Sequence, residues 1–179
     1  MNFAISRILV PVDFSPHSEH ALRYAAAFAG RLDALVEIFH VVEEPAAAGA
    51  WGWDVPMPDL SELRDRLIVE AERQLDHQCR PIIEGSRVRM VTTVRMGQPG
   101  QTIAAHAKTA GVDLIVMGTH GRGVSHLLMG SVTERVARYA PCPVLTVRAR
   151  GTHEEIEPMF MGERAALGWL LGHHGTSRE

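Results

Sequence analysis

Short runs of apolar residues, many of them β-branched, recur along the first 148 residues and alternate with segments of helical character. Runs this short and continuous are typical of strands buried on both faces of a parallel sheet. The predicted strands cover residues 7–12, 34–42, 87–95, 112–117 and 143–148. Strands that alternate with helices predict an α/β fold, a doubly wound parallel sheet with helices on both faces and right-handed crossovers.

Helical spacing of apolar residues and capping residues locate the helices. Ser15 and Pro16 suit the N-cap and the first helical position of the first helix. Asp59 or Ser61 would cap a second, polar helix that reaches about Cys79. The predicted helices cover residues 15–33, 59–79, 98–110 and 131–140.

The segment between the fourth strand and the last helix is the most informative one for function. Gly118, Gly121 and Gly130 punctuate it, and Ser131 and Glu134 stand at the spacing of a capping box with Ser131 as N-cap. Glycines let backbone N–H groups approach a ligand, and a helix N-terminus adds unpaired donors and partial positive charge. The segment therefore predicts a cradle for a nucleotide phosphate.

The fold would place this cradle where ligands bind. In an open parallel sheet, ligands occupy the crevice at the carboxyl ends of the strands, at the topological switch point. Three predicted loops gather at that edge: residues 13–15, the residues from Val41 onward, and residues 118–130.

Composition changes near residue 150. Residues 151–179 hold five glutamates against two arginines and account for the net charge of −3, whereas residues 1–150 are balanced. Apolar residues within 155–171 fit an amphipathic helix despite Pro158. We therefore predict one domain over 1–150 and a helical C-terminal extension over 151–179, which packs on the domain, mediates assembly or stays flexible.

Several function classes are excluded or disfavoured. Lys108 is the single lysine and no Gly-Lys-Ser/Thr occurs, which excludes a P-loop kinase or ATPase. The net charge of −3 argues against a nucleic-acid partner, and no apolar run approaches the roughly 20 residues that span a membrane. Residues 1–7 lack signal-peptide features, and Cys79 and Cys142 have no disulfide or metal spacing. We expect a cytoplasmic protein.

Four segments in this order resemble the universal stress protein family: ILVPVDFSPHSEHALRYAAAFA, FHVVEEP, VRMGQPGQTIAAHAKTAGVDLIVMGTHGRG and LLMGSVTERVARYAPCPVLTVR. The resemblance covers residues 5–148 and implies a five-stranded, Rossmann-like parallel sheet with strand order 3-2-1-4-5. Many members are homodimers whose fifth strands pair edge to edge, which would also protect an exposed apolar edge. The pairing residues here would be Val144, Leu145, Thr146 and Val147.

The resemblance also implies a binding site for ATP or a related adenine nucleotide. Asp13 and Val41 would contact the adenine and ribose, and the backbone around Gly130 would donate to the phosphates. The candidate residues are Pro11, Asp13, Val41, Met117, Gly118, Gly121, Arg122, Gly130, Ser131, Val132 and Thr133.

Some of these residues also have ordinary structural interpretations. Asp13 could form an Asx-turn, or it could serve as a carboxylate on the Mg²⁺ side of a nucleotide. Helix capping alone explains a serine at position 131, although a phosphate would accept hydrogen bonds from the same backbone N–H groups at the start of the helix. His120 and Arg122 are candidates for phosphate contact or members of a solvated loop.

The glycine pattern departs from the family at one point. ATP-binding members have nine residues between the second and third glycines, whereas eight residues separate Gly121 from Gly130. A shorter loop could narrow the cradle. The leading hypothesis is a stress-response regulatory protein that binds an adenine nucleotide, with Mg²⁺ as an accompanying ion. The alternatives are a dimeric interaction module that binds no nucleotide, and a slow ATPase.

No catalytic constellation emerges: the chain has no nucleophile elbow, no paired carboxylates at a plausible site and no Walker lysine. We therefore do not expect a dedicated enzyme. The ten histidines form no set at zinc spacing. Trp51 and Trp53, in the predicted loop over 43–58, are interpreted either as a cover over a ligand or partner, or as part of a surface loop. Cys142 is interpreted as a small apolar residue.

Overall fold

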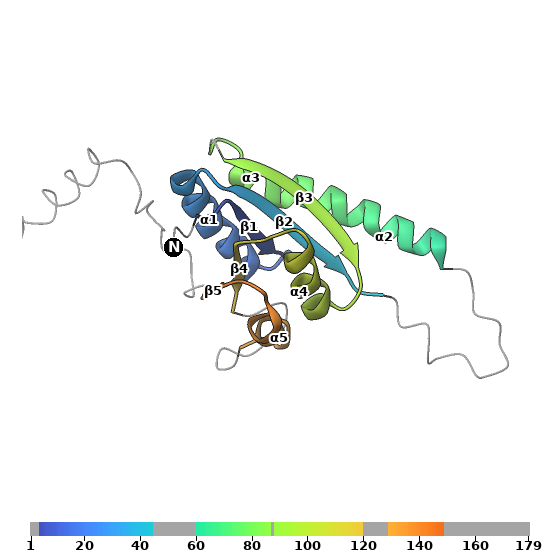
Figure 1. Ribbon diagram of the computed structural model, residues 1–179. Coiled ribbons are helices and arrows are strands. Elements are labelled where there is room, and N and C mark those ends of the chain that lie inside the picture. The colour runs from blue at the N-terminus through green and yellow to red at the C-terminus, as the bar shows by residue number, and fades with distance from the viewer. Residues whose placement is uncertain (1–3, 45–59, 87, 120–128, 149–179) are drawn as a thin grey trace, which may run out of the picture. The chain divides into compact units, whose positions relative to one another are not determined.

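The computed structural model describes residues 4–44, 60–86, 88–119 and 129–148, and they form the predicted α/β fold (Figure 1). Five parallel strands lie in the order β3-β2-β1-β4-β5, which confirms the predicted fold class and strand order. The strands are β1 (Arg7–Pro11), β2 (Leu35–Val42), β3 (Arg89–Met96), β4 (Leu114–Gly118) and β5 (Val144–Val147). The helices are α1 (Pro16–Leu32), α2 (Ser61–Gln74), the π-helical turn η1 (Leu75–Cys79), α3 (Arg80–Ile83), α4 (Pro99–Thr109) and α5 (Ser131–Tyr139).

The apolar core forms two layers, one on each face of the sheet. Ile8 of β1 belongs to the layer that includes Leu22 of α1 and Ile83 of α3. Its neighbour Leu9 belongs to the other layer, with Ile103 of α4. This alternation along a central strand is the reason that β1 is apolar at every position after Arg7. Because β1 pairs with both β2 and β4, the topological switch point lies between β1 and β4.

The helix ends confirm one predicted cap and correct another. The Ser15 hydroxyl accepts a hydrogen bond from the Ser18 N–H at 3.3 Å and Pro16 begins α1, as predicted. In α2, Leu60 takes the N-cap position and Ser61 is the first helical residue, so the prediction of Ser61 as cap is wrong. The helical path also continues past Cys79 to Ile83.

Several predicted features lie outside the described residues. All the described residues belong to the unit Met1–Ala149. The predicted helical extension over 151–179 lies outside the described residues, and so do Trp51, Trp53 and Asp59.

A buried carboxylate on β2 organises the sheet face that α4 covers. The Glu37 side chain is 2% exposed, and its Oε2 lies 3.0 Å from both Nε and Nη2 of Arg7. Its Oε1 accepts a hydrogen bond from the Thr93 hydroxyl at 2.9 Å and lies 2.8 Å from Nε2 of His106. Burial raises the pKa of Glu37, but the hydrogen bonds of Thr93 and His106 and the charges of His106 and Arg7 outweigh it, so the pKa is lowered. Glu37 is therefore an ionised core residue held by three partners.

Candidate functional site

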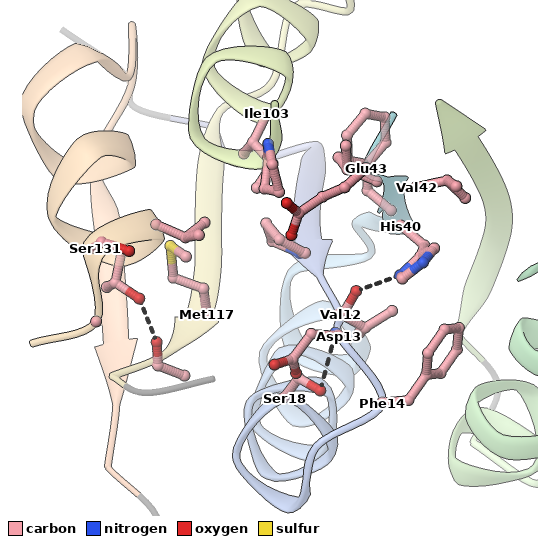
Figure 2. Close-up of a pocket in the computed structure, with 18 of the residues that line it drawn as sticks. Val12, Asp13, Phe14, Ser18, His40, Val42, Glu43, Ile103, Met117 and Ser131 are labelled. Carbon is pink, nitrogen blue, oxygen red and sulfur yellow. Dashed lines mark hydrogen bonds between the residues drawn. The ribbon is translucent and has the colours of Figure 1, made fainter. Parts of the chain in front are cut away.

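A cavity of about 480 Å³ opens at the carboxyl edge of the sheet, where β1, β2 and β4 end (Figure 2). It lies beside the switch point, as a ligand site in such a sheet should. Of the predicted site residues, those that line the cavity are Pro11, Asp13, Val41, Met117, Gly118, Gly130, Ser131, Val132 and Thr133. The others, Gly121 and Arg122, lie outside the described residues, as does His120. Residues far apart in the chain are thus brought to one cavity, although their contact with a ligand stays a prediction.

The turn after β1 is held by its own side chains. Oδ1 of Asp13 accepts hydrogen bonds from the Ser15 N–H at 3.1 Å and from the Ser15 hydroxyl at 2.5 Å, which forms the Asx-turn considered above. The Asp13 N–H donates to the Ser18 hydroxyl oxygen at 3.3 Å. Phe14, between Asp13 and Ser15, has a positive φ of 60°, a conformation that bulky residues rarely adopt. The turn is therefore a rigid wall of the cavity with one strained residue.

Gly118, at the end of β4, is a glycine for a packing reason. A Cβ on Gly118 would lie 3.1 Å from the backbone C and O and from the Cβ of His17, in the first turn of α1. Its carbonyl accepts a hydrogen bond from the buried Thr133 hydroxyl at 3.0 Å, which ties β4 to α5. Gly118 thus lets α1, β4 and α5 meet closely beside the cavity, whether or not it also faces a ligand.

The N-terminus of α5 differs from the predicted capping box. Gly130 is the N-cap, with extended φ and ψ of −62° and 147°, and Ser131 is the first helical residue. The prediction of Ser131 as N-cap is wrong because the helix begins one residue earlier than predicted, and the N–H of Glu134 donates to the Gly130 carbonyl. The Glu134 carboxylate instead pairs with Arg138 at 2.9 Å, one turn further along the helix.

This arrangement leaves the start of α5 without a side-chain cap. The first N–H groups of a helix have no intrahelical acceptor, and no side chain of the described residues caps α5, because its N-cap is glycine. In contrast, α1 is capped by Ser15. The N–H groups of Ser131, Val132 and Thr133 therefore belong to the helix end at the cavity wall, where partial positive charge favours an anion.

The opposite side of the cavity contains residues that the sequence did not single out. Phe14, His40, Glu43 and Gln74 line it, from the turn after β1, the end of β2 and the end of α2. Nδ1 of His40 lies 2.8 Å from the Val12 carbonyl oxygen, and its ring centroid lies 4.5 Å from that of Phe14. His40 lies near the end of the predicted strand over 34–42 and Glu43 follows that strand, so their position at the sheet edge was the available signal.

The cavity has an electrostatic polarity. None of the described lining residues is Lys or Arg, so attraction for an anion there comes from the α5 N-terminus. The carboxylates of Asp13 and Glu43 lie on the other side of β4, toward β1 and β2. A ligand that is anionic at one end and carries hydrogen-bond donors at the other would match this distribution.

The described residues offer little for metal or nucleophilic chemistry. Within them, no three His, Cys, Asp or Glu side chains gather closely enough to hold a metal ion. Burial raises the pKa of the Cys79 thiol to about 11 and also raises that of Cys142, so both thiols are protonated near neutral pH. None of the described helices has the length and apolar character needed to cross a membrane.

Known proteins match the chain over the same region. The model of the Universal stress protein family matches residues 4–148. A universal stress protein of Methanocaldococcus jannaschii is 30% identical over an alignment of 164 positions, which covers 85% of this chain and 100% of the relative. Another from the same organism is 34% identical over 143 residues, covering 79% of this chain and 81% of the relative. Among solved structures, UspA of Lactobacillus plantarum is 32% identical, with a TM-score of 0.68 over 82% of this chain and 100% of its own.

Proposed function

Because the chain belongs to the universal stress protein family, we propose that it is a cytoplasmic stress-response regulator that binds an adenine nucleotide. The observation that carries this proposal is the α5 N-terminus, which has no side-chain cap and lines a 480 Å³ cavity. A phosphate supplies the acceptor oxygens that such a helix end lacks. Pocket volumes of about 300–1,000 Å³ suit small-molecule ligands of this kind.

Two solved structures of the same fold support the choice of an adenine nucleotide. A universal stress protein in complex with cAMP has a TM-score of 0.52 and is 21% identical to this chain. A universal stress protein of Archaeoglobus fulgidus in complex with dAMP has a TM-score of 0.56 and is 23% identical. The fold can thus hold an adenylate, and this chain has its own cavity in which one could bind.

In this proposal each side of the cavity has a separate task. The phosphates lie against the N–H groups of Ser131, Val132 and Thr133, and the base lies toward Val41 at the end of β2. Pro11 and Met117 line the path between them. If ATP is the ligand, Mg²⁺ accompanies its phosphates, and we place Asp13 beside the ribose. Binding would shift the population of conformations presented to a partner protein, which requires no turnover.

Thermal unfolding with ATP, ADP, AMP and cAMP, each with magnesium, tests this proposal. A ligand that binds only the folded protein stabilises it by about 2.7 kcal/mol at a concentration of one hundred times its Kd. We expect an increase in Tm that depends on nucleotide concentration and is larger with adenine nucleotides than with inorganic triphosphate. No increase with any of them would contradict the proposal and favour an interaction module that binds no nucleotide.

We also propose that two chains pair through their β5 strands. Strand β5 is at the end of the sheet order, and its ladder partner among the described strands is β4. The carbonyls of Pro143 and Val147 accept hydrogen bonds from β4 and the residue after it, so they face β4. Because strand residues alternate in direction, Thr146 directs its backbone groups to the free edge. An unpaired edge of this kind invites pairing with a second chain.

Replacing Thr146 with proline should convert the dimer to a monomer. Proline removes the N–H that Thr146 directs outward and leaves the ladder between β4 and β5 intact. Thr146→Val keeps the N–H and should remain dimeric. Light scattering after size-exclusion chromatography measures the mass of each variant. A dimer of unchanged stability in Thr146→Pro would show that the interface lies elsewhere.

A further inference from the structure

Glu43, which directly follows β2, places a carboxylate in the lining of the cavity. Strand residues alternate between the two faces, so Glu43 follows Phe39 and Val41 on the face that α4 covers. Figure 2 shows its side chain directed into the cavity, toward the side where Ile103 lies, with Ser131 across the view. Its neighbour Glu44 is absent from the cavity lining and pairs with Arg64 at 3.4 Å. Adjacent carboxylates of the same type therefore have different surroundings.

The sheet separates this carboxylate from the phosphate end. Strand β1 lies between β2 and β4, and neighbouring strands are about 4.8 Å apart, so the ends of β2 and β4 are about 10 Å apart. An ionised carboxylate accepts hydrogen bonds and donates none, and it repels phosphate. Glu43 thus disfavours a nucleotide bound in the reverse orientation, with its phosphates near β2. It favours a ligand that carries a hydrogen-bond donor near the end of β2.

We propose that Glu43 is a specificity-determining residue that accepts a hydrogen bond from the exocyclic 6-amino group of adenine. This inference rests on the nucleotide-binding function proposed above. Hypoxanthine has a carbonyl oxygen in place of that amino group and would present an acceptor to the carboxylate. When the ligand presents an acceptor to an acceptor of the site, neither group forms a hydrogen bond. Such a site discriminates strongly between ligands that are otherwise identical. Because Glu43 is exposed, its contribution is moderated by water.

Binding of ATP and of ITP, which differ in the base at this position, tests the inference. We expect the wild type to bind ATP about tenfold more tightly than ITP. In Glu43→Gln the ratio should fall to about two or less, because an amide can donate to the hypoxanthine oxygen as well as accept from adenine. Glu43→Ala should lose the preference as well, because it offers no acceptor. Glu44→Gln removes the same charge outside the cavity and should keep the tenfold ratio.

The ratio of affinities is the decisive readout, because removal of a negative charge strengthens the binding of both triphosphates alike. An unchanged ratio in both Glu43 variants would overturn the inference and leave the proposed function standing. Failure of the wild type to bind either nucleotide would overturn the proposed function and the inference together. Calorimetric titration gives each Kd, and the thermal unfolding of the empty variants confirms that they are folded.

Discussion

Replacing Arg7 with methionine should lower the free energy of unfolding by about 2–3 kcal/mol. The substitution removes the guanidinium, whose Nε and Nη2 lie 3.0 Å from Oε2 of Glu37, and also the hydrogen bond from Nη1 to the Ala110 carbonyl. Breaking a buried pair from one side typically costs about 3–5 kcal/mol, because it leaves a buried charge with fewer partners. The expected loss is smaller here because the Arg7 side chain is 33% exposed and Thr93 and His106 remain.

Two variants serve as controls for Arg7→Met. Arg23→Met breaks the pair with Glu19, whose members are 54% and 49% exposed, and should cost less than about 1 kcal/mol. The double variant Arg7→Met/Glu37→Met removes both charges and should be more stable than the sum of the single effects predicts. Urea unfolding measures each free energy. A loss in Arg7→Met no larger than in Arg23→Met would show that the Glu37 network does not stabilise the sheet.

The same network predicts a dependence on pH. The pKa of Glu37 is lowered by folding, so its ionised form contributes stability above the unfolded value of about 4.5, and this contribution is lost as the pH falls through the folded value. The charge of Arg7 is one of the causes that lower the pKa of Glu37, and Arg7→Met removes it. The difference in stability between the wild type and Arg7→Met should therefore shrink below about pH 4.5. A difference that stays constant down to pH 3 would contradict this explanation.

Replacing Ser131 with aspartate should weaken ATP binding by at least about 30-fold, which corresponds to about 2 kcal/mol. Ser131 is the first residue of α5 and lines the cavity, so the new carboxylate would stand beside the phosphates. A like charge at about 4 Å costs roughly 1–4 kcal/mol, depending on the solvent exposure of the pair. The empty protein should be unharmed, because an acidic residue in the first turn stabilises a helix by about 0.3–1 kcal/mol.

Ser131→Asn is the matched control, because it has the size of aspartate without the charge. It should bind ATP within about threefold of the wild type, and adenosine, which carries no phosphate, should bind all three proteins alike. Calorimetric titration gives the affinities. Wild-type affinity in Ser131→Asp would contradict the placement of the phosphates at α5. An equal loss in both variants would indicate that the hydroxyl, and not the charge, matters.

The sheet and the location of the site could be predicted because both depend on local patterns. Apolar runs such as the one from Arg7 to Val12 show a buried strand directly, and strand alternation with helices determines which edge collects the loops. The start of α5 was misplaced by one residue because Ser131 and Gly130 are both acceptable N-caps. Local sequence does not decide between them, whereas the bond from the Gly130 N–H to the Thr119 carbonyl does.

Other features depend on partners distant in the chain. In the sequence, Glu37 is a charged residue within an otherwise apolar strand. Its structural role depends on its partners Arg7, 30 residues before it, and His106, 69 residues after it. The strained turn at Phe14 and its contact with the His40 ring are likewise products of tertiary packing. No periodicity in the sequence reports such pairs, and so Phe14 and His40 were not predicted among the site residues.

An NMR titration of the wild type with ATP tests the central claim most directly, because backbone amide shifts report where a ligand binds. Phosphate at the start of α5 should shift the amides of Ser131, Val132 and Thr133 most strongly, with further shifts at Val41 and Asp13 around the base and ribose. The shifts should saturate with a single Kd. Saturation with the largest shifts away from the cavity, or no shifts at millimolar ATP, would contradict the assignment of a nucleotide site to this cavity.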